Sequence, residues 1–185
     1  MRMSCTLALV AILELAAATS ASAQAPSGRA APELGIGYTG LKLFPVLDNG
    51  AQTDHDADLR VTAPLTRRFA VEGFVTIGRY RNQWQEREER GFYGVQIKQR
   101  LAGISGDRFQ AFVTYGSVGQ YSRVHLFGRT EHHVTPPWLP LAGGGFQQTL
   151  GQSRVGWRVD AQAVLFAYVP FGFRVSTGLS IPLAR

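Results

Sequence analysis

A strict alternation of side-chain types over residues 154–166 restricts the possible folds more than any other feature. Counted from Val155, every second residue is Val, Trp, Val, Ala, Ala and Leu, whereas the residues between them are Arg, Gly, Arg, Asp, Gln, Val and Phe. Successive side chains of a β-strand point to opposite faces of the sheet. The stretch therefore predicts a strand with an apolar face and a charged face, and the fold depends on which of them points inward.

The N-terminal segment has the layout of a secretory signal peptide. Met1, Arg2 and Met3 precede an apolar run, and the small residues Ala21-Ser22-Ala23 predict cleavage before Gln24. We expect residues 1–23 to be the signal peptide and the small, polar, proline-flanked residues 24–32 to be a flexible lead-in. A signal anchor is the alternative, and it would place Glu14 in a membrane helix, which is costly.

Cysteine content and charge narrow the class of protein. Cys5 is the only cysteine and lies in the predicted signal peptide, so the exported chain has no disulfide. The formal net charge is +6 at pH 7, which favours anionic partners such as lipid phosphates. Because the arginines are spread through alternating segments and not gathered on one stripe, we expect no nucleic-acid partner.

The remainder of the chain, residues 33–185, reads as one β domain. Alternating segments occur at about residues 33–44, 57–65, 68–80, 91–102, 107–119, 138–150, 154–167 and 171–183. The first, third and fifth connections are long, including residues 120–137, and those between them are short. Eight strands suffice to close a barrel, and long loops at one end with tight turns at the other are typical of outer-membrane barrels.

The polar residues keep to one face of each segment. On residues 68–80, Val71, Val75 and Ile77 alternate with Glu72 and Thr76. The polar face is modest and carries both signs of charge, which suits a narrow lumen, while the apolar face suits lipid. The first segment fits least, because its apolar positions change parity after Tyr38, and a β-bulge near Gly40 would restore the pattern.

We expect the charged face to form a polar network inside the barrel. One row across the lumen is predicted to contain Arg60, Glu72, Lys98 and Gln110, with Arg100, Arg158, Asp160 and Arg174 contributing elsewhere. Aromatic residues are predicted to mark the two membrane interfaces. They are Phe44, Tyr80, Phe92, Tyr93, Tyr115, Tyr121, Trp138, Phe166, Tyr168, Phe171 and Phe173 at the loop end, and Phe69, Phe109 and Trp157 at the turn end.

With these features, the chain resembles the small eight-stranded outer-membrane β-barrel family of Gram-negative bacteria, the OmpA-type or porin-like barrel domains. The resemblance covers about residues 33–185 and includes a last segment, FRVSTGLSIPLAR, that lacks the terminal aromatic residue usual in the family. It implies an all-β, eight-stranded antiparallel up-and-down transmembrane barrel in the outer membrane. It also implies contact with outer-membrane lipid and lipopolysaccharide, and insertion by the barrel assembly machinery.

Catalytic and metal-binding alternatives rest on few residues. Ser122, His125, Glu131, His132 and His133 could supply a lipid A-modifying site, which needs a serine beside a histidine and an acid. The paired histidines, or His55 with Asp54, Asp56 or Asp58, could bind a metal, although adjacent histidines point in divergent directions. A secreted lipocalin-like barrel with an apolar ligand cavity is the other alternative.

The sequence therefore favours a non-enzymatic outer-membrane barrel. We expect it to contribute to envelope integrity, adhesion or ligand contact through its external loops, with at most small permeability, because an eight-stranded lumen is filled by side chains. We expect no cofactor, and we expect the barrel to be a monomer.

Overall fold

The computed structural model describes residues 31–43, 52–81, 87–102, 108–126, 129–152, 154–166 and 169–183. The predicted signal peptide and residues 24–30 of the predicted lead-in lie outside the described residues. Within the described part of the chain, no helix has the length and apolar character needed to cross a membrane.

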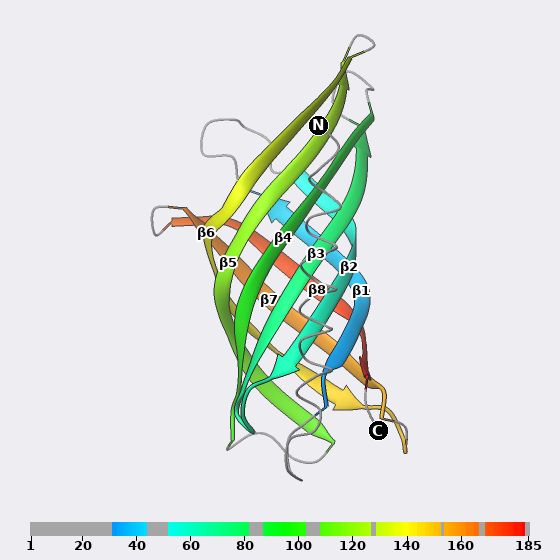
Figure 1. The fold of residues 1–185 in the computed structure, drawn as a ribbon, viewed down its shortest axis with the longest axis vertical. Helices are drawn as coiled ribbons and strands as arrows, with labels where there is room; N and C mark the ends of the chain where they lie inside the picture. The colour runs from blue at the N-terminus through cyan, green and yellow to red at the C-terminus, as the bar shows by residue number, and fades with distance from the viewer. Residues whose placement is uncertain are drawn as a thin grey trace.

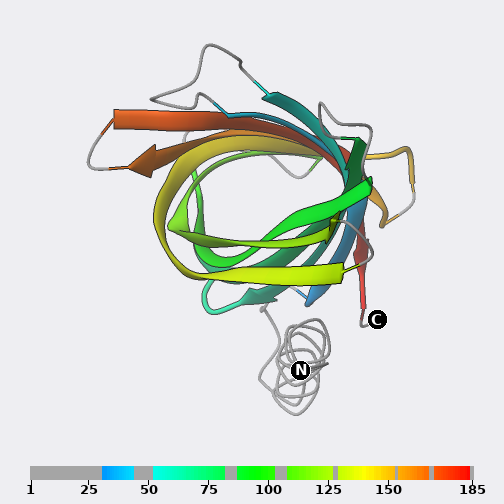
Figure 2. The ribbon, with the colours of Figure 1, turned by 90° about the horizontal axis from the view of Figure 1, so that it is seen from above.

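Eight antiparallel strands follow one another in chain order around a closed barrel (Figures 1 and 2). The barrel closes where β1 pairs with β8, from Glu33 opposite Pro182 to Leu43 opposite Gly172. The predicted all-β, up-and-down architecture is confirmed. The strands are β1 (Glu33–Leu43), β2 (Gln52–Pro64), β3 (Phe69–Arg81), β4 (Arg87–Arg100), β5 (Phe109–Leu126), β6 (Arg129–Thr149), β7 (Gly156–Phe166) and β8 (Val169–Pro182).

The apolar faces of the strands point outward and the polar faces point into the lumen. On β7, Trp157 is 38% exposed, whereas its neighbours Arg158 and Asp160 are 7% and 2% exposed. The same alternation holds on β8, where Val175 and Leu179 are exposed and Arg174 and Ser176 are buried. The prediction that the apolar side faces outward is confirmed. The lipocalin-like alternative does not fit, because most of the described buried side chains are polar or charged.

The strands differ in length, and two of them extend well beyond the others. A transmembrane strand needs about 9–11 residues, and β5 and β6 have 18 and 21. Figure 1 shows their hairpin rising past the β7–β8 hairpin. The expectation of a long loop over residues 120–137 was therefore wrong: Gln120 pairs with Thr135 and Leu126 with Arg129. Alternation fails as a signal there because the side chains of residues 129–134 are all exposed, so the two faces of this part of β6 do not differ in burial.

The irregularities of the sheet lie elsewhere than predicted. The register of β1 with both neighbours runs without a shift from Glu33 to Leu43, so the expected bulge near Gly40 is absent. A shift occurs instead opposite residues 118–120 of β5, where β6 contains Pro136 and Pro137. Proline has no N–H to donate to a ladder and is tolerated at such irregularities.

Two of the predicted interface aromatics have other roles. Phe92 is 6% exposed and packs inside the barrel. Tyr121 lies across Gly91, and its hydroxyl donates a 3.2 Å hydrogen bond to the Thr76 carbonyl oxygen. Tyr115, Trp138, Phe173, Phe109 and Trp157 are exposed, in agreement with a lipid-facing or interfacial position.

Two facing glycines allow the seam between β1 and β8 to close. Gly37 and Gly178 are paired across this seam. A Cβ built on Gly178 would lie 2.4 Å from the Ile36 carbonyl oxygen and 2.6 Å from the Gly37 Cα, too close for any side chain. Gly40, in the same seam, has no such restriction, because its nearest neighbour would be 4.0 Å from an added Cβ.

We therefore expect Gly178→Ala to impair closure of the barrel, since β1 and β8 must separate to admit the methyl group. The measurement is the fraction of refolded protein that migrates faster on a detergent gel when unboiled, which we expect to fall by at least half. Gly40→Ala is the matched control and should behave as the unchanged chain. Equal fractions for the two variants would contradict this account of the seam.

Candidate functional site

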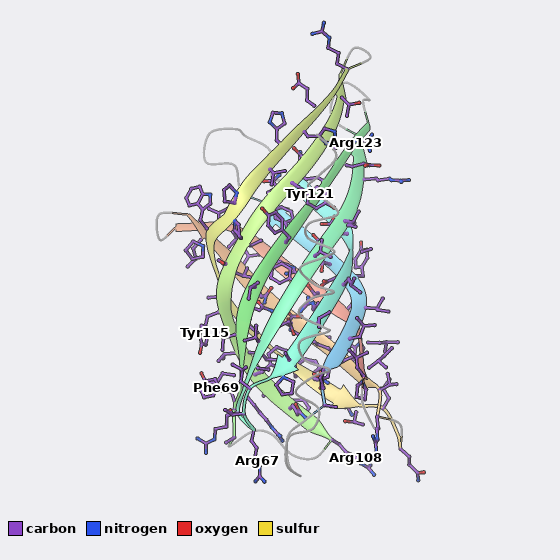
Figure 3. The ribbon with its side chains drawn as sticks, in the orientation of Figure 1. Arg67, Phe69, Arg108, Tyr115, Tyr121 and Arg123 are labelled. Carbon is purple, nitrogen blue, oxygen red and sulfur yellow. The ribbon has the colours of Figure 1, made fainter. Side chains whose placement is uncertain are left out.

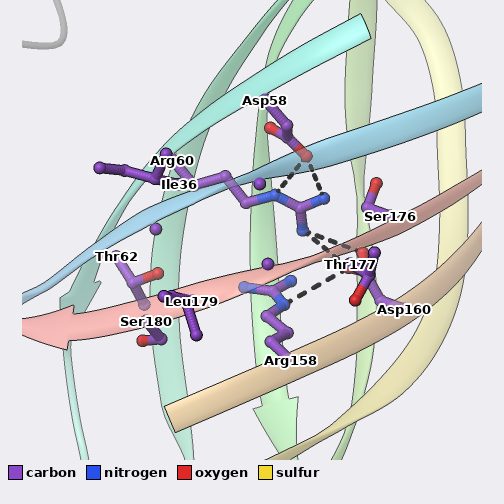
Figure 4. Close-up of a pocket in the computed structure, with 13 residues that line it drawn as sticks. Ile36, Asp58, Arg60, Thr62, Arg158, Asp160, Ser176, Thr177, Leu179 and Ser180 are labelled. Atoms are coloured by element: carbon purple, nitrogen blue, oxygen red, sulfur yellow. Dashed lines mark hydrogen bonds and ion pairs between the residues drawn. The ribbon is translucent and has the colours of Figure 1, made fainter. Parts of the chain in front are cut away.

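Six charged residues occupy the middle of the lumen and form the central cluster, and Figure 4 shows four of them, Asp58, Arg60, Arg158 and Asp160. They are Asp58 and Arg60 on β2, Glu72 on β3, Arg158 and Asp160 on β7, and Arg174 on β8. All are buried, and the three arginines balance the three carboxylates. Each sits at an inward position of its strand, so the alternation that places apolar residues in lipid also places these charges together.

Arg60 joins the two sides of the central cluster. Its Nη1 donates to both carboxylate oxygens of Asp160 at 2.9 Å, and its Nε and Nη2 donate to Asp58 at 2.9 and 2.5 Å. Arg174 Nη2 donates to the same Asp58 oxygen at 2.9 Å. Strands β2, β7 and β8 are thereby linked across the lumen through charge-assisted hydrogen bonds, which are stronger than neutral ones.

Glu72 is the most enclosed member of the central cluster, with no exposed surface. Both Nη atoms of Arg158 donate to its carboxylate, and Arg60 Nη1 lies 3.5 Å from Oε1. Thr62 and Gln96 add hydrogen bonds of 2.8 and 2.6 Å. One carboxylate thus connects β2, β3, β4 and β7.

Neutral polar residues extend this network toward the loop end. Gln162 donates to Gln96 Oε1 at 2.7 Å and to Thr114 Oγ1 at 2.9 Å, and Arg174 donates to Gln162 Oε1 at 3.3 Å. On the other wall, the Thr39 hydroxyl donates to Asp58 at 2.8 Å. Side chains from β1 and β5 therefore join those of the central cluster.

An apolar layer lies on the loop-end side of the charges. On β7, Val164 follows Arg158 and Asp160 in the direction of the β7–β8 connection, and it packs with Phe74, Phe92, Val118 and Leu141. The Arg174 guanidinium lies 4.2 Å from the centre of the Phe74 ring. The cavity beside the central cluster has a volume of only about 20 Å³. The lumen is thus filled at this level, and no wide aqueous channel passes through the central cluster.

Of the predicted row across the lumen, the structure brings together Arg60 and Glu72, whereas Lys98 is paired with Ala70 and Gln110 lies farther along β5. Lys98 is paired with Thr114, four residues on from Gln110. Lys98 donates to Gln147 at 2.9 Å and makes no described ion pair with Glu72. Gln110 and Arg100 are half-buried and line a separate cavity at the turn end, together with Lys98.

Several network members were not predicted, although parity would have identified them. Asp58 was considered only as a possible metal ligand, yet it lies two residues before Arg60 on β2 and shares its inward face. Gln162 stands in the same relation to Asp160, and Gln96 to Lys98. An amide gives a weaker sequence signal than a charge, but its position on an alternating strand fixes its direction.

The proposed catalytic residues at the loop end are only partly brought together. Ser122 lies opposite His133 in the β5–β6 hairpin, and His133 Nε2 is 3.6 Å from Glu131. Among the described contacts no hydrogen bond joins Ser122 to His133, whose side chain is 67% exposed. A serine nucleophile needs such a bond to its base and a site that excludes water. The side chain of His125 lies outside the described residues.

The proposed metal ligands point in different directions. His55 is on the outer surface, where its ring stacks on Tyr38 and hydrogen-bonds the Tyr38 hydroxyl, whereas Asp56 and Asp58 are buried inside the barrel. The Asp54 side chain lies outside the described residues. The described part of the chain contains no group of three or more histidine, cysteine or carboxylate side chains that could hold a metal ion.

No protein-family model and no curated protein matches the chain by sequence. Solved structures do match it, and they share its closed eight-stranded ladder. The chain has the fold of the small outer-membrane β-barrels.

Among these structures, Neisserial surface protein A has a TM-score of 0.63 at 9% identity, covering 85% of this chain and all of that one. The N-terminal β-barrel domain of Pseudomonas aeruginosa OprF has a TM-score of 0.58 at 9% identity, covering 83% of this chain and 98% of that one. Ail, the attachment invasion locus protein of Yersinia pestis, was solved with the heparin analogue sucrose octasulfate. It has a TM-score of 0.52 at 12% identity, covering 83% of this chain and 97% of that one.

Removal of the Glu72 charge should destabilise the barrel strongly. In Glu72→Gln, Arg60 and Arg158 keep their burial but lose their shared carboxylate, and we expect the free energy of unfolding to fall by about 3–5 kcal/mol. The measurement is urea unfolding from phosphatidylcholine vesicles, followed by tryptophan fluorescence.

Glu89→Gln is the control for this change. Glu89 forms ion pairs of 3.4 and 3.6 Å with Arg79 and Arg123, but all three side chains are at least 36% exposed. Exposed ion pairs contribute at most about 1 kcal/mol. Similar losses for the two variants would show that burial of Glu72 does not govern its contribution.

Proposed function

We propose that this protein is an outer-membrane barrel without enzymatic activity, which contacts ligands or surfaces through the hairpins at its loop end. The observation that carries the proposal is the inverted distribution of side chains: apolar residues cover the outside while the central cluster fills the lumen. Such a barrel is stable in lipid and conducts little. The work then falls to the parts that project from the membrane.

The β5–β6 hairpin is the main projecting surface. Many of its described side chains are polar and exposed, among them Arg123, Arg129, Glu131, His132 and His133. Figure 3 shows Arg123 at the loop end, opposite Arg67 and Arg108 at the turn end. Positive side chains on an extended hairpin suit a polyanionic ligand. Lipopolysaccharide and the sulfated glycans of a host surface are ligands of this kind. The heparin analogue bound by Ail makes a sulfated polysaccharide the first probe to use.

Location and closure of the barrel can be tested together. We expect the protein in the outer-membrane fraction of an expressing Gram-negative cell, as a band that migrates faster unboiled than boiled. In planar bilayers we expect conductance far below that of a general porin, because side chains fill the lumen. A protein found in the soluble periplasm without a heat shift would overturn the proposal.

Ligand contact needs a separate test. Cells carrying the chain should bind immobilised heparin, and Arg123→Gln with Arg129→Gln should reduce that binding several-fold. The pair Arg108→Gln with Arg154→Gln removes the same charge from the turn end and should leave binding unchanged. If both double variants bind as the unchanged chain does, or if the unchanged chain does not bind, the hairpin is not the contact surface for this class of ligand.

A further inference from the structure

The turn end of the lumen contains a second cavity, distinct from the central cluster and open to solvent. Its volume is about 90 Å³, which is enough for a small hydrated anion. Its lining contains four cationic residues, Arg67, Arg68, Lys98 and Arg100, and one acidic residue, Glu33. The cavity is therefore strongly positive, although the charges of the central cluster are balanced.

Lys98 is the deepest cation of this cavity and the one that most needs an anion. It is only 8% exposed, its Nζ donates to the neutral Gln147 Oε1, and it lies 4.5 Å from the centre of the Phe112 ring. No carboxylate among the described residues forms an ion pair with it. A buried ammonium held by an amide and an aromatic ring is incompletely compensated.

Glu33 attracts Lys98 electrostatically, but it forms no direct ion pair with it. Its Oε2 accepts hydrogen bonds of 2.6 Å from the Ser180 hydroxyl and 3.3 Å from Gln147 Nε2. Gln147 thus bonds to both groups, with its oxygen toward Lys98 and its nitrogen toward Glu33. The amide holds the carboxylate and the ammonium apart.

The arginines at the rim are placed by a well-defined turn. The Thr66 hydroxyl oxygen accepts hydrogen bonds from the backbone N–H groups of Arg68 and Phe69 at 3.1 and 3.0 Å. The Arg100 N–H donates to the Arg68 carbonyl oxygen at 2.8 Å, which ties the end of β4 to this turn. Arg67, Arg68 and Arg100 therefore belong to one hydrogen-bonded unit beside Lys98.

We propose that this cavity binds a phosphate group, with Lys98 at its base and the arginines at its rim. Guanidinium groups bind phosphate oxygens in pairs, and an ammonium adds a point charge. The phosphate is either that of a soluble ion or metabolite or that of a phospholipid headgroup. The proposed function assigns no role to this cavity.

The test uses the refolded barrel in a maltoside detergent, which contains no phosphorus, with inorganic phosphate as the probe. We expect the chain to broaden the ³¹P resonance of phosphate, and sulfate but not chloride to reverse the broadening. Lys98→Met should abolish it, and Arg67→Gln with Arg68→Gln should weaken it several-fold. Arg108→Gln with Arg154→Gln is the control for lost charge at the same end and should preserve it.

The outcomes separate this proposal from the proposed function. Each sample is first checked for its heat shift, so that failure to form a barrel counts against the outer-membrane assignment and not against the cavity. If Lys98→Met does not refold, the rim variant decides. A folded barrel that does not broaden the signal, or broadening that both the Lys98 and rim variants retain, would overturn the phosphate site.

Repetition in phospholipid nanodiscs identifies the source of the phosphate. Broadening by inorganic phosphate that persists there indicates a soluble ligand. Broadening present in maltoside but lost in nanodiscs indicates that lipid headgroups occupy the cavity. Both results support the site.

Discussion

Three carboxylates and three arginines lie in the middle of the lumen and neutralise one another. The rest of the barrel depends on this neutralisation. Each of these groups would be costly to bury alone. Paired as they are, with Glu72 bonded to Arg158, Thr62 and Gln96, they hold distant strands in a fixed relation across the lumen. The outer face can then consist of apolar side chains, because the charged side chains pair with one another inside the barrel.

The barrel also depends on a closed ladder of backbone hydrogen bonds. Glycine residues allow this closure while the charged side chains fill the lumen. A strand edge left open in hydrocarbon would leave N–H and C=O groups without partners, so β1 must meet β8. The cavity beside the central cluster is lined by Gly35, Gly37 and Gly178 as well as by Arg60 and Arg158. Small residues at these positions allow the strands to approach while the long guanidinium side chains cross the interior.

The distribution of charge along the barrel axis divides the molecule by function. The centre is neutral and filled, the projecting β5–β6 hairpin carries exposed charges of both signs, and the turn end has an excess of positive charge around Lys98. Ligands can therefore contact the barrel at either end, whereas the filled centre has no room for them.

The sequence by itself determined the fold class and the direction of most lumen residues. Alternation with period two fixes which face of a strand a residue occupies, and an apolar majority on one face identifies the lipid side, so Arg158, Asp160 and Arg174 could be placed inside. Only the tertiary structure decided which polar groups meet. Contacts across a barrel depend on strand register, which the alternation of side chains does not reveal. Neither the shift opposite residues 118–120 nor the register that puts Thr114, and not Gln110, beside Lys98 changes that alternation. The pairing of Glu72 on β3 with Arg158 on β7 therefore follows from closure of the barrel, which brings these strands together across the lumen.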